Sequence, residues 1–355
     1  MIHPSKINIY PIEKSYTIPS EWYYDDTLFN LEKSSIFSKS WHLVGPEKVI
    51  PNVGDSIVKK INNQPIIISR QKDESVKAFY NVCQHRGGPL LRKNTCLKAF
   101  QCKYHGWTYN LNGTLIKTRE FEGVKDFEIE KHSLKSIDLR SWMGLIFINF
   151  KVGSNFPVEI FKEIENRIAP INFLNYIHHS NVSYSIKCNW KTYIDNYLEG
   201  YHIPFVHPKL NKVINYKLYK TELFKNHSLQ SVPIEPDKNP YKRNKKSDIF
   251  AYYYTIFPNI LLNIAPGRLQ TNVIEPISEK LCKVHFDYYF EKVDTNAIKR
   301  DIDFSNEIQK EDIQICEEVQ IGLESKGYDQ GRISIQSEKG LHHFQSILKK
   351  GLKDG

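Results

Sequence analysis

The sequence predicts an α+β protein of two domains, an antiparallel β domain followed by a larger domain of antiparallel sheet and long helices. Residues 41–150 contain short runs of alternating apolar and polar residues, separated by turn signals such as Asn62-Asn63 and Asn112-Gly113. Beyond residue 155, strand-like runs are mixed with longer segments in which apolar residues recur at helical spacing. We place the domain boundary near residues 151–157, around Gly153-Ser154-Asn155.

The individual elements follow from the same patterns. Strand-like runs of the first domain are residues 56–58, 65–69, 78–82 and 144–150, and Asp25–Phe37 before them predicts a short helix. In the second domain we predict helices over 158–168, 190–203 and 303–323, and strands over 181–189, 250–264 and 280–292. Pro204 is expected to end the helix over 190–203, because proline breaks a helix that reaches it.

Composition excludes several classes of protein. The 355 residues are 40% hydrophobic and 13% aromatic, which favours a packed core over disorder. No apolar run approaches the roughly 20 residues that span a bilayer, and the N-terminus lacks the layout of a signal peptide, so we expect a cytoplasmic protein without membrane association. The sequence has none of the common DNA- or RNA-binding motifs, so we expect no nucleic-acid partner.

The net charge of +9 has two interpretations. The charge keeps the protein in solution, or it attracts an acidic partner protein, because complementary electrostatic potentials raise the rate at which two proteins associate. The densest basic run, residues 242–246, is expected to be a solvated loop.

Six cysteines in a chain of this length, without an export signal, do not suggest a disulfide framework. Two of them have histidine neighbours at ligand spacing, in Cys83-Gln84-His85 and in Cys102-Lys103-Tyr104-His105. Two thiolates and two imidazoles are the ligands of a Rieske [2Fe–2S] cluster, and the same set also binds structural zinc. The spacing alone does not distinguish a Rieske cluster from a structural zinc site.

The residues beside these ligands favour the cluster. His85-Arg86-Gly87-Gly88-Pro89 and His105-Gly106-Trp107-Thr108-Tyr109 resemble the two cluster loops of Rieske proteins, glycines included. Respiratory Rieske proteins carry an additional cysteine in each loop, and here those places hold Gly88 and Tyr104, as in oxygenase and ferredoxin types. The remaining thiols are interpreted as ordinary buried or loop cysteines, namely Cys96, Cys188, Cys282 and Cys316.

A second constellation follows at residues 189–208. Asp195, Glu199 and His202 stand at i, i+4 and i+7, so a continuous helix would present them on one face. A break at Pro204 would then turn His207 back toward His202. Two imidazoles and one carboxylate on one face of an iron form the facial triad of non-haem Fe(II) oxygenases, which leaves positions open for O2 and substrate.

Together these motifs make the whole chain resemble the α subunits of aromatic-ring-hydroxylating Rieske oxygenases, and within them the choline-monooxygenase-like group. The matching stretches are Ile18–Tyr23, Asp195–His202, Phe257–Asn259, Glu311–Asp312, Cys316–Glu317, Val319–Leu323 and Ser337–Phe344. The resemblance implies an N-terminal segment (1–37) that packs on the catalytic domain, a Rieske [2Fe–2S] domain (38–155), and a mononuclear-iron catalytic domain of helix-grip, START-like fold (156–355).

The resemblance also implies roles for single residues. The third iron ligand is an aspartate on the late helix, and Asp312 occupies that place, with Glu311, Glu317 and Glu318 as nearby rivals. A carboxylate three residues before the first iron histidine bridges to a cluster histidine of the neighbouring subunit in a head-to-tail homotrimer. Many members have aspartate there, whereas this chain has Glu199. Asp195 is expected to orient an iron histidine.

The implied reaction takes electrons at the cluster and activates O2 at a mononuclear Fe(II), beside a small organic substrate. The sequence has no Rossmann glycine motif, so NAD(P)H is expected to act through a separate reductase, with or without a ferredoxin. The choline-monooxygenase resemblance implies a quaternary ammonium substrate, to be hydroxylated or N-demethylated. Two interpretations are open for a group of aromatic residues in the catalytic half. They form an aromatic box around the quaternary ammonium group, or they belong to the core of a strand; the residues are Tyr252, Tyr253, Tyr254 and Phe257. Alternatives are dioxygenation of an aromatic ring and, more remotely, a Rieske electron carrier without oxygenase activity.

Overall fold

The computed structural model describes residues 7–234, 250–292 and 294–353, so the basic run at 242–246 lies outside the described residues. Contacts divide the chain into unit 1, Met1–Phe37 with Val158–Gly355, and unit 2, Ser38–Pro157. The finer division at residues 37/38 and 155/156, with its assigned functions, stays a prediction. In the described part of the chain, no helix is both long and apolar enough to cross a membrane.

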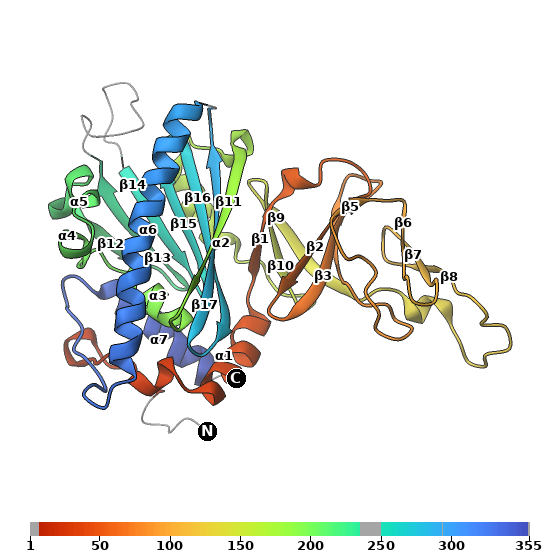
Figure 1. Cartoon of the computed structure of the whole chain (residues 1–355), viewed down its shortest axis with the longest axis horizontal. Helices are drawn as coiled ribbons and strands as arrows, with labels where there is room; N and C mark the ends of the chain where they lie inside the picture. The colour runs from red at the N-terminus through yellow and green to blue at the C-terminus, as the bar shows by residue number, and fades with distance from the viewer. Residues whose placement is uncertain (1–6, 235–249, 293, 354–355) are drawn as a thin grey trace. The chain divides into compact units, whose positions relative to one another are not determined.

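Unit 2 is built on a seven-stranded antiparallel sheet in the order β1-β10-β9-β4-β3-β2-β5 (Figure 1). Its strands are β1 (His42–Pro46), β2 (Asp55–Ile61), β3 (Gln64–Arg70), β4 (Val76–Tyr80), β5 (Thr95–Cys96), β9 (Ser136–Trp142) and β10 (Leu145–Asn149). A separate three-stranded sheet consists of β6 (Ala99–Gln101), β7 (Thr108–Asn110) and β8 (Leu115–Lys117). This small sheet carries one of the two cysteine–histidine loops.

The predicted turns of unit 2 are confirmed. Asn62 and Asn63 join β2 to β3 with φ values of 47° and 62°, as a two-residue hairpin turn requires. Gly113 has a φ of 89° between β7 and β8, and a Cβ at this position would lie 2.6 Å from the ring of Phe79. Backbone conformation and close packing therefore both favour glycine there.

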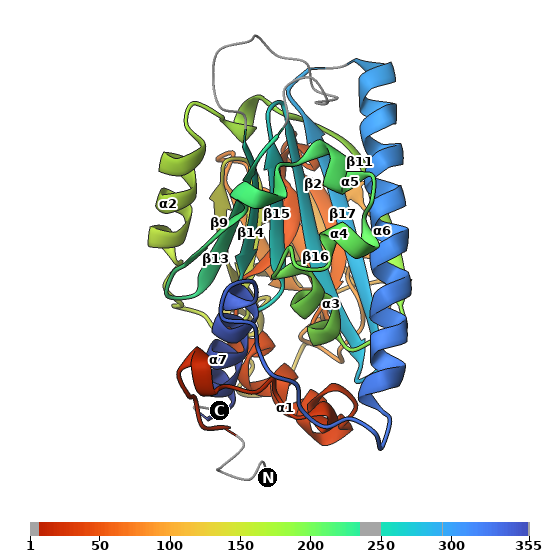
Figure 2. The ribbon, with the colours of Figure 1, turned by 90° about the vertical axis from the view of Figure 1, so that its left-hand side faces the viewer.

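Unit 1 is built on a second seven-stranded antiparallel sheet, in the order β11-β17-β16-β15-β14-β13-β12. Its strands are β11 (Ile177–Ile186), β12 (Lys220–Leu223), β13 (His227–Pro233), β14 (Phe250–Ile256), β15 (Ile260–Ala265), β16 (Arg268–Ser278) and β17 (Leu281–Phe290). The long helix α6 (Thr295–Leu323) runs across this sheet (Figure 1). Helices α3 (Trp190–Tyr197) and α4 (Ile203–Val206) contact α6 (Figure 2).

The other helices are α1 (Asp26–Ser35), α2 (Val158–Ile168), α5 (Leu210–Val213) and α7 (Lys339–Lys353). Short 3₁₀ turns occupy Ile12–Lys14, Ser20–Tyr23, Phe37–Lys39, Glu47–Val49, Ile129–His132, Phe173–Asn175 and Tyr216–Leu218. Sheet and helices together confirm the α+β class predicted from the sequence.

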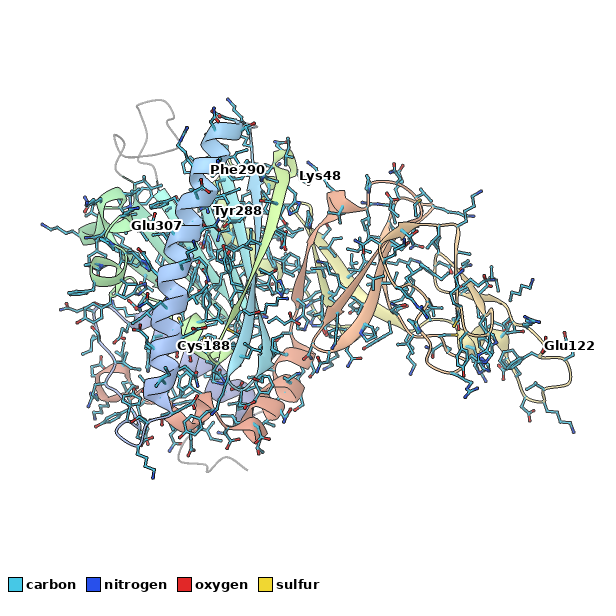
Figure 3. The ribbon with its side chains drawn as sticks, in the orientation of Figure 1. Lys48, Glu122, Cys188, Tyr288, Phe290 and Glu307 are labelled. Carbon is cyan, nitrogen blue, oxygen red and sulfur yellow. The ribbon has the colours of Figure 1, made fainter. Side chains whose placement is uncertain are left out.

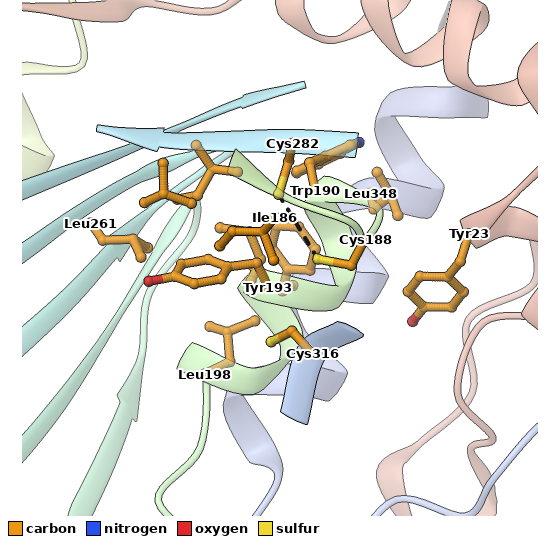
Figure 4. Close-up of a cluster of buried hydrophobic side chains, with 14 of the residues drawn as sticks. Tyr23, Ile186, Cys188, Trp190, Tyr193, Leu198, Leu261, Cys282, Cys316 and Leu348 are labelled. Atoms are coloured by element: carbon orange, nitrogen blue, oxygen red, sulfur yellow. Dashed lines mark hydrogen bonds between the residues drawn. The ribbon is translucent and has the colours of Figure 1, made fainter. Parts of the chain in front are cut away.

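The core of unit 1 packs the N-terminal segment against α3. The buried carboxylate of Glu32 on α1 accepts hydrogen bonds from Trp190 Nε1 and Lys191 Nζ, each at 2.7 Å. Because both carboxylate oxygens have a donor, the charge of Glu32 is compensated although no solvent reaches it. In the same core, Cys188, Cys282 and Cys316 are buried free thiols, with 3.9 Å between the sulfurs of Cys188 and Cys282 (Figure 4).

Two predicted helix boundaries are wrong. The helix expected over 190–203 ends at Tyr197, and Pro204 lies in the first turn of a new helix, α4. The carboxylate of Glu199 accepts hydrogen bonds from the backbone N–H groups of Tyr201 and His202, which replaces helical bonding there. The late helix begins at Thr295 instead of 303, because Asp294 caps it by accepting from Asn296 N and Ala297 N.

Candidate metal centres

The two cysteine–histidine pairs lie in two matching loops of unit 2. In the loop after β4, Cys83 N donates to Gly88 O at 2.8 Å. In the loop between β6 and β7, Cys102 N donates to Trp107 O at 2.9 Å. Each cysteine therefore opens a tight turn that closes on its own backbone five residues later.

Three glycines shape these turns. Gly87 and Gly106 have φ values of 71° and 76°, in the left-handed region that favours glycine. Each donates its N–H back to the carbonyl of the cysteine four residues earlier. A Cβ on Gly88 would lie 3.3 Å from Cys102 Sγ, so glycine keeps open the space around this sulfur.

The ring centroids of the two histidines lie 4.6 Å apart, and His85 stacks on Trp107 at 4.8 Å. Nδ1 of His85 is buried without a hydrogen-bond partner. Desolvation, together with the neighbouring His105 and Arg86, lowers the pKa of His85 and favours its neutral form. A neutral imidazole with an unused ring nitrogen suits a metal ligand.

Cys83 and Cys102 are both buried. The hydroxyl oxygen of Tyr109 accepts the N–H of Gln84 at 3.0 Å and lies 3.4 Å from Cys83 Sγ, so its own proton is free to point at the sulfur. Burial raises the pKa of the Cys83 thiol, and a bound metal would compensate the thiolate charge that burial disfavours.

The spread of the four donors distinguishes a cluster from a zinc ion. Tetrahedral zinc with bonds of about 2.0–2.3 Å brings its ligand atoms within about 4 Å of one another. Among the described residues, no three of the donors from Cys83, His85, Cys102 and His105 lie within 4.8 Å of one another. The residues therefore fit a two-iron cluster better than a single zinc ion.

His202, His207 and Asp312 come together in unit 1, with one ligand atom from each within 4.8 Å of the others. His207 Nε2 lies 3.0 Å and His202 Nε2 3.8 Å from Asp312 Oδ1. His202 precedes α4, His207 follows it, and Asp312 lies on α6. The short helix α4 therefore sets the separation of the histidines, and α6 brings the aspartate from a distant part of the chain.

The other ring nitrogen of each histidine contacts a glutamate. His202 Nδ1 lies 2.7 Å from Glu199 Oε1, and His207 Nδ1 lies 2.7 Å from Glu311 Oε2. Because a carboxylate only accepts, each glutamate favours a proton on Nδ1. Nε2 of His202 is then left for a metal, and Nε2 of His207, which contacts Asp312 here, would turn to a metal that the two residues share. Asn196 Nδ2 donates to Asp312 Oδ1 at 2.7 Å and fixes the third donor.

This donor set fits a non-haem iron, since two imidazoles and one carboxylate leave other coordination positions open. Of the rival carboxylates, Glu311 contacts His207 from the side away from Asp312. Glu317 accepts from Lys187 N and Glu318 from Gln314 Nε2, so neither belongs to this group. The sequence named Glu311 only as a rival ligand, because spacing does not show which histidine nitrogen it reaches.

Asp195 lies away from the histidines, contrary to the expectation that it orients one of them. Its Oδ2 accepts from Tyr23 Oη at 2.5 Å and from Gln345 Nε2 at 3.3 Å. The helix ends two residues after Asp195, so the predicted common face with Glu199 and His202 does not form. Burial raises the pKa of Asp195 to about 7.

A cavity of about 170 Å³ adjoins His202, His207 and Asp312. Six aromatic side chains line it, namely Tyr193, Tyr197, Tyr219, Tyr253, Phe286 and Phe304. Tyr197 donates its hydroxyl to Asn263, and Tyr219 donates to Gln230 at 2.6 Å, so both rings are held in place. Such a volume suits a small organic molecule, because an engineered cavity of about 150 Å³ holds benzene.

Of the four aromatic residues predicted for a box, only Tyr253 lines the cavity. Tyr254 is fully buried beside His227, and Phe257 packs against Phe344. Tyr254 therefore fits the strand-core interpretation, whereas Phe257 lies just past β14 and Tyr252 is only partly buried. No sequence pattern indicated Tyr197 or Tyr219 as lining residues, because the fold brings them from α3 and from the segment before β12.

The charged side chains of the lining are Glu199, Asp301, Asp312 and Arg268. Arg268 Nε on β16 lies 2.7 Å from Asp301 Oδ2 on α6, and both side chains are nearly buried. Carboxylates thus outnumber guanidinium groups three to one around the cavity. A divalent ion held by the triad would offset this excess.

Comparison with known proteins agrees with both centres. Residues 40–128 match the model of the Rieske [2Fe-2S] domain, and residues 173–353 match the ring hydroxylating alpha subunit (catalytic domain). The chain is 31% identical to the chloroplastic choline monooxygenase of Arabidopsis thaliana, over 97% of this chain and 84% of that protein. It is 29% identical to the carnitine monooxygenase oxygenase subunit of Escherichia coli K12, over 96% and 95% of the two chains.

The fold also matches a solved structure, that of the quaternary ammonium Rieske monooxygenase CntA in complex with L-carnitine. The TM-score is 0.84 at 25% identity, covering 97% of this chain and 99% of that one. This likeness confirms the predicted fold class, and the family confirms the expected [2Fe–2S] cluster and non-haem iron as cofactors. The chain belongs to the family of Rieske-type ring-hydroxylating oxygenase α subunits, and it is an O2-dependent oxidoreductase of that family.

Proposed function

We propose that this oxygenase oxidises a small quaternary ammonium compound at an iron held by His202, His207 and Asp312, using electrons from a cluster held by Cys83, His85, Cys102 and His105. The observation that carries the proposal is the convergence of the three iron-site donors, within 4.8 Å, at the wall of a small aromatic cavity. When bound, the cluster supplies single electrons and the iron supplies open positions for O2.

The side chains around the iron site prepare it for this chemistry. Glu199 and Glu311 hold the histidine protons on Nδ1, and Asn196 holds the carboxylate of Asp312. Their role is to present three donors in one orientation, which limits reorganisation when the metal binds. The apolar part of the lining keeps water from the reacting carbon; it includes Ile203, Leu210, Val213 and Ile214.

Charge and aromatic surface support a quaternary ammonium substrate. A trimethylammonium group cannot donate hydrogen bonds, so aromatic faces and nearby carboxylates are the groups that attract it. The rings of Tyr197 and Tyr253 lie edge to face in the cavity wall, 6.4 Å between centroids. With a divalent ion offsetting the excess of carboxylates, the charged groups of the lining would sum to zero, so a cation enters without net repulsion. Both relatives named above act on quaternary ammonium compounds, choline and carnitine.

The partners follow from the same proposal. The Escherichia coli relative is one subunit of its monooxygenase, which supports a separate reductase for this chain, with or without a ferredoxin. We further propose a homotrimer in which Glu199 connects the iron site to a cluster histidine of the neighbouring subunit. Oε1 of Glu199 contacts His202 Nδ1, and a carboxylate oxygen has a second lone pair for another donor. A solution mass of three chains is the expected result of light scattering.

A single turnover tests the function. The holoenzyme is reduced without oxygen, given choline, glycine betaine or carnitine, and then exposed to O2, with products identified by mass spectrometry. An oxidised or demethylated product from one of them is expected from the native enzyme. The variant His207→Ala should give none, and the exposed control His179→Ala should react normally. No product from any of the three, with both metal centres loaded, would refute the quaternary ammonium substrate.

A further inference from the structure

One buried hydrogen-bond donor in the cavity wall has no partner. Gln309 on α6 lines the cavity, and its side chain is 2% exposed. Within the described residues, no group accepts a hydrogen bond from its Nε2, which is itself buried. A donor left unpaired in the interior loses its hydrogen bonds to water and gains nothing in return, so native proteins seldom keep one without a use for it.

Tyr193 sets the orientation of this amide. Its hydroxyl on α3 donates to Gln309 Oε1 at 2.7 Å, and the Tyr193 side chain is buried as well. In the described part of the chain, the reverse orientation would leave the hydroxyl proton of Tyr193 without an acceptor and the amide oxygen without a donor. The carbonyl end of Gln309 is therefore occupied, and its N–H end remains to be paired.

Gln309 lies one helical turn before the iron-site residue Asp312 on α6. Three residues of α-helix rise about 4.5 Å along the helix axis. Matching contacts from α3 hold both residues, because Asn196 donates to Asp312 at 2.7 Å as Tyr193 donates to Gln309. The same pair of helices thus fixes the metal donor and the unpaired N–H in one wall of the cavity.

A neighbouring row of polar side chains is satisfied within the protein. Gln270 Nε2 donates to Asn272 Oδ1 at 2.7 Å, and Gln270 Oε1 accepts from Ser305 Oγ at 3.1 Å. Ser305 in turn accepts from Tyr288 Oη at 3.0 Å, which connects β17 to α6 (Figure 3). These groups need no ligand to complete their hydrogen bonds, in contrast to Gln309.

The charges around the cavity indicate which kind of oxygen would accept from Gln309. Arg268, the guanidinium of the lining, lies 2.7 Å from Asp301 Oδ2 and also donates to Gln270. A buried carboxylate is strongly disfavoured when its partner is a single neutral amide. A hydroxyl oxygen carries no charge and accepts such a bond readily. The site therefore suits an alcohol better than a carboxylate.

We propose that Gln309 Nε2 donates a hydrogen bond to a hydroxyl oxygen of the substrate, so that the cavity selects a trimethylammonium alcohol. This rests on the proposed function, which supplies the quaternary ammonium end. Tyr197 follows Tyr193 by one turn of α3, and its ring packs edge to face with Tyr253 at 6.4 Å between centroids. Aromatic faces for the ammonium group and a donor for the hydroxyl group thus lie in one cavity.

Two matched ligands test this inference. Choline and propyltrimethylammonium share the ammonium group and the chain length, and they differ in a hydroxyl against a methyl group. Each is titrated by calorimetry into the reduced holoenzyme without O2, so no turnover occurs. The native protein is expected to bind choline about tenfold more tightly or better, because the methyl group leaves the buried donor unpaired. Glycine betaine, with a carboxylate in place of the CH2OH group, should bind more weakly than choline.

Three variants separate the role of the donor from general damage. Gln309→Met keeps the length of the side chain without its donor, and it should remove most of the preference for choline while changing the affinity for propyltrimethylammonium less than about threefold. Tyr193→Phe leaves Gln309 in place but releases its amide, so the preference should fall by a smaller factor. Gln314→Met, at an exposed position of the same helix, should keep the native preference.

Equal affinity of the native protein for the two matched ligands would overturn the inference, and so would a preference that survives in Gln309→Met. Tighter binding of glycine betaine than of choline would overturn the choice of a neutral oxygen. If Gln309→Met does not fold, the native comparison and Tyr193→Phe still decide. Failure of every quaternary ammonium ligand to bind would refute the proposed function itself, which is a different result from equal binding of choline and its analogue.

Discussion

The carboxylate of Glu311 lies 2.7 Å from Nδ1 of His207, on the ring nitrogen that does not face Asp312. Glu199 makes the same contact with His202. Neighbouring residues of α6 thus divide two tasks, since Asp312 supplies a metal donor and Glu311 aligns the histidine opposite it. A helix turns by about 100° per residue, so adjacent side chains reach different sides of one imidazole.

Removing the acceptor on His207 should weaken iron binding. We expect Glu311→Ala to lower the affinity for Fe(II) by about 10- to 100-fold, and Glu311→Gln, which keeps one acceptor oxygen, to lower it less. Titration of metal-depleted protein with Fe(II) measures this, with the cluster absorbance as an internal reference. Glu307→Gln on the same helix is the control, because Glu307 pairs with the exposed residue Lys209. Equal affinities in all variants would show that Glu311 has no orienting role.

The cluster loops were predictable because most of their determinants are local. Within each loop, the ligands and the glycines lie within a few residues of one another, so the backbone itself places them. The stacking of Trp107 on His85 is the contact that joins the two loops. The iron site is different, since Asp312 is far along the chain from His207 and only the resemblance identified it. Asp195 was misplaced because the pattern assumed a continuous helix, whereas the side chain of Glu199 takes over the backbone N–H groups that would extend it.

The cavity could not be predicted from the sequence. Its wall combines residues from α3, β14, β16 and α6, and only the register of the sheet decides which side chains face inward. Tyr253 and Tyr254 illustrate this, because neighbours on a strand point to opposite faces. Tyr253 lines the cavity and Tyr254 enters the core.

Gly88→Ala should impair cluster assembly. The added Cβ would lie 3.3 Å from Cys102 Sγ, and a sulfur bound to iron cannot move aside. We expect less than half the native cluster content, measured by iron analysis and visible absorption. Gly322→Ala on α6 is the matched control, since its Cβ would meet no atom within 4 Å. Full cluster content in Gly88→Ala would show that the loop has room to shift.

Arg268 and Asp301 should depend on each other for stability. Their side chains are 12% and 2% exposed, so Arg268→Gln would leave a nearly buried carboxylate without its cation. Breaking such a pair costs about 3–5 kcal/mol, whereas removing both charges can be nearly neutral. We therefore expect R268Q to unfold at lower urea concentration and R268Q/D301N to recover most of the loss. Additive losses in the double variant would contradict this coupling.

The pH dependence of stability should contain a contribution from Asp195. Burial raises its pKa from 3.8 to about 7, so between these values the folded protein holds a proton that the unfolded chain has lost. Folding stability therefore falls as pH rises from about 4 to about 7, and above that range the penalty is constant. Asp195→Asn removes the titration while keeping an oxygen to accept the hydroxyl of Tyr23. Relative to the native protein, we expect the variant to gain on the order of 4 kcal/mol at pH 8 and almost nothing at pH 4, measured by urea unfolding. A difference that does not change with pH would mean that Asp195 keeps an ordinary carboxyl pKa in the folded state.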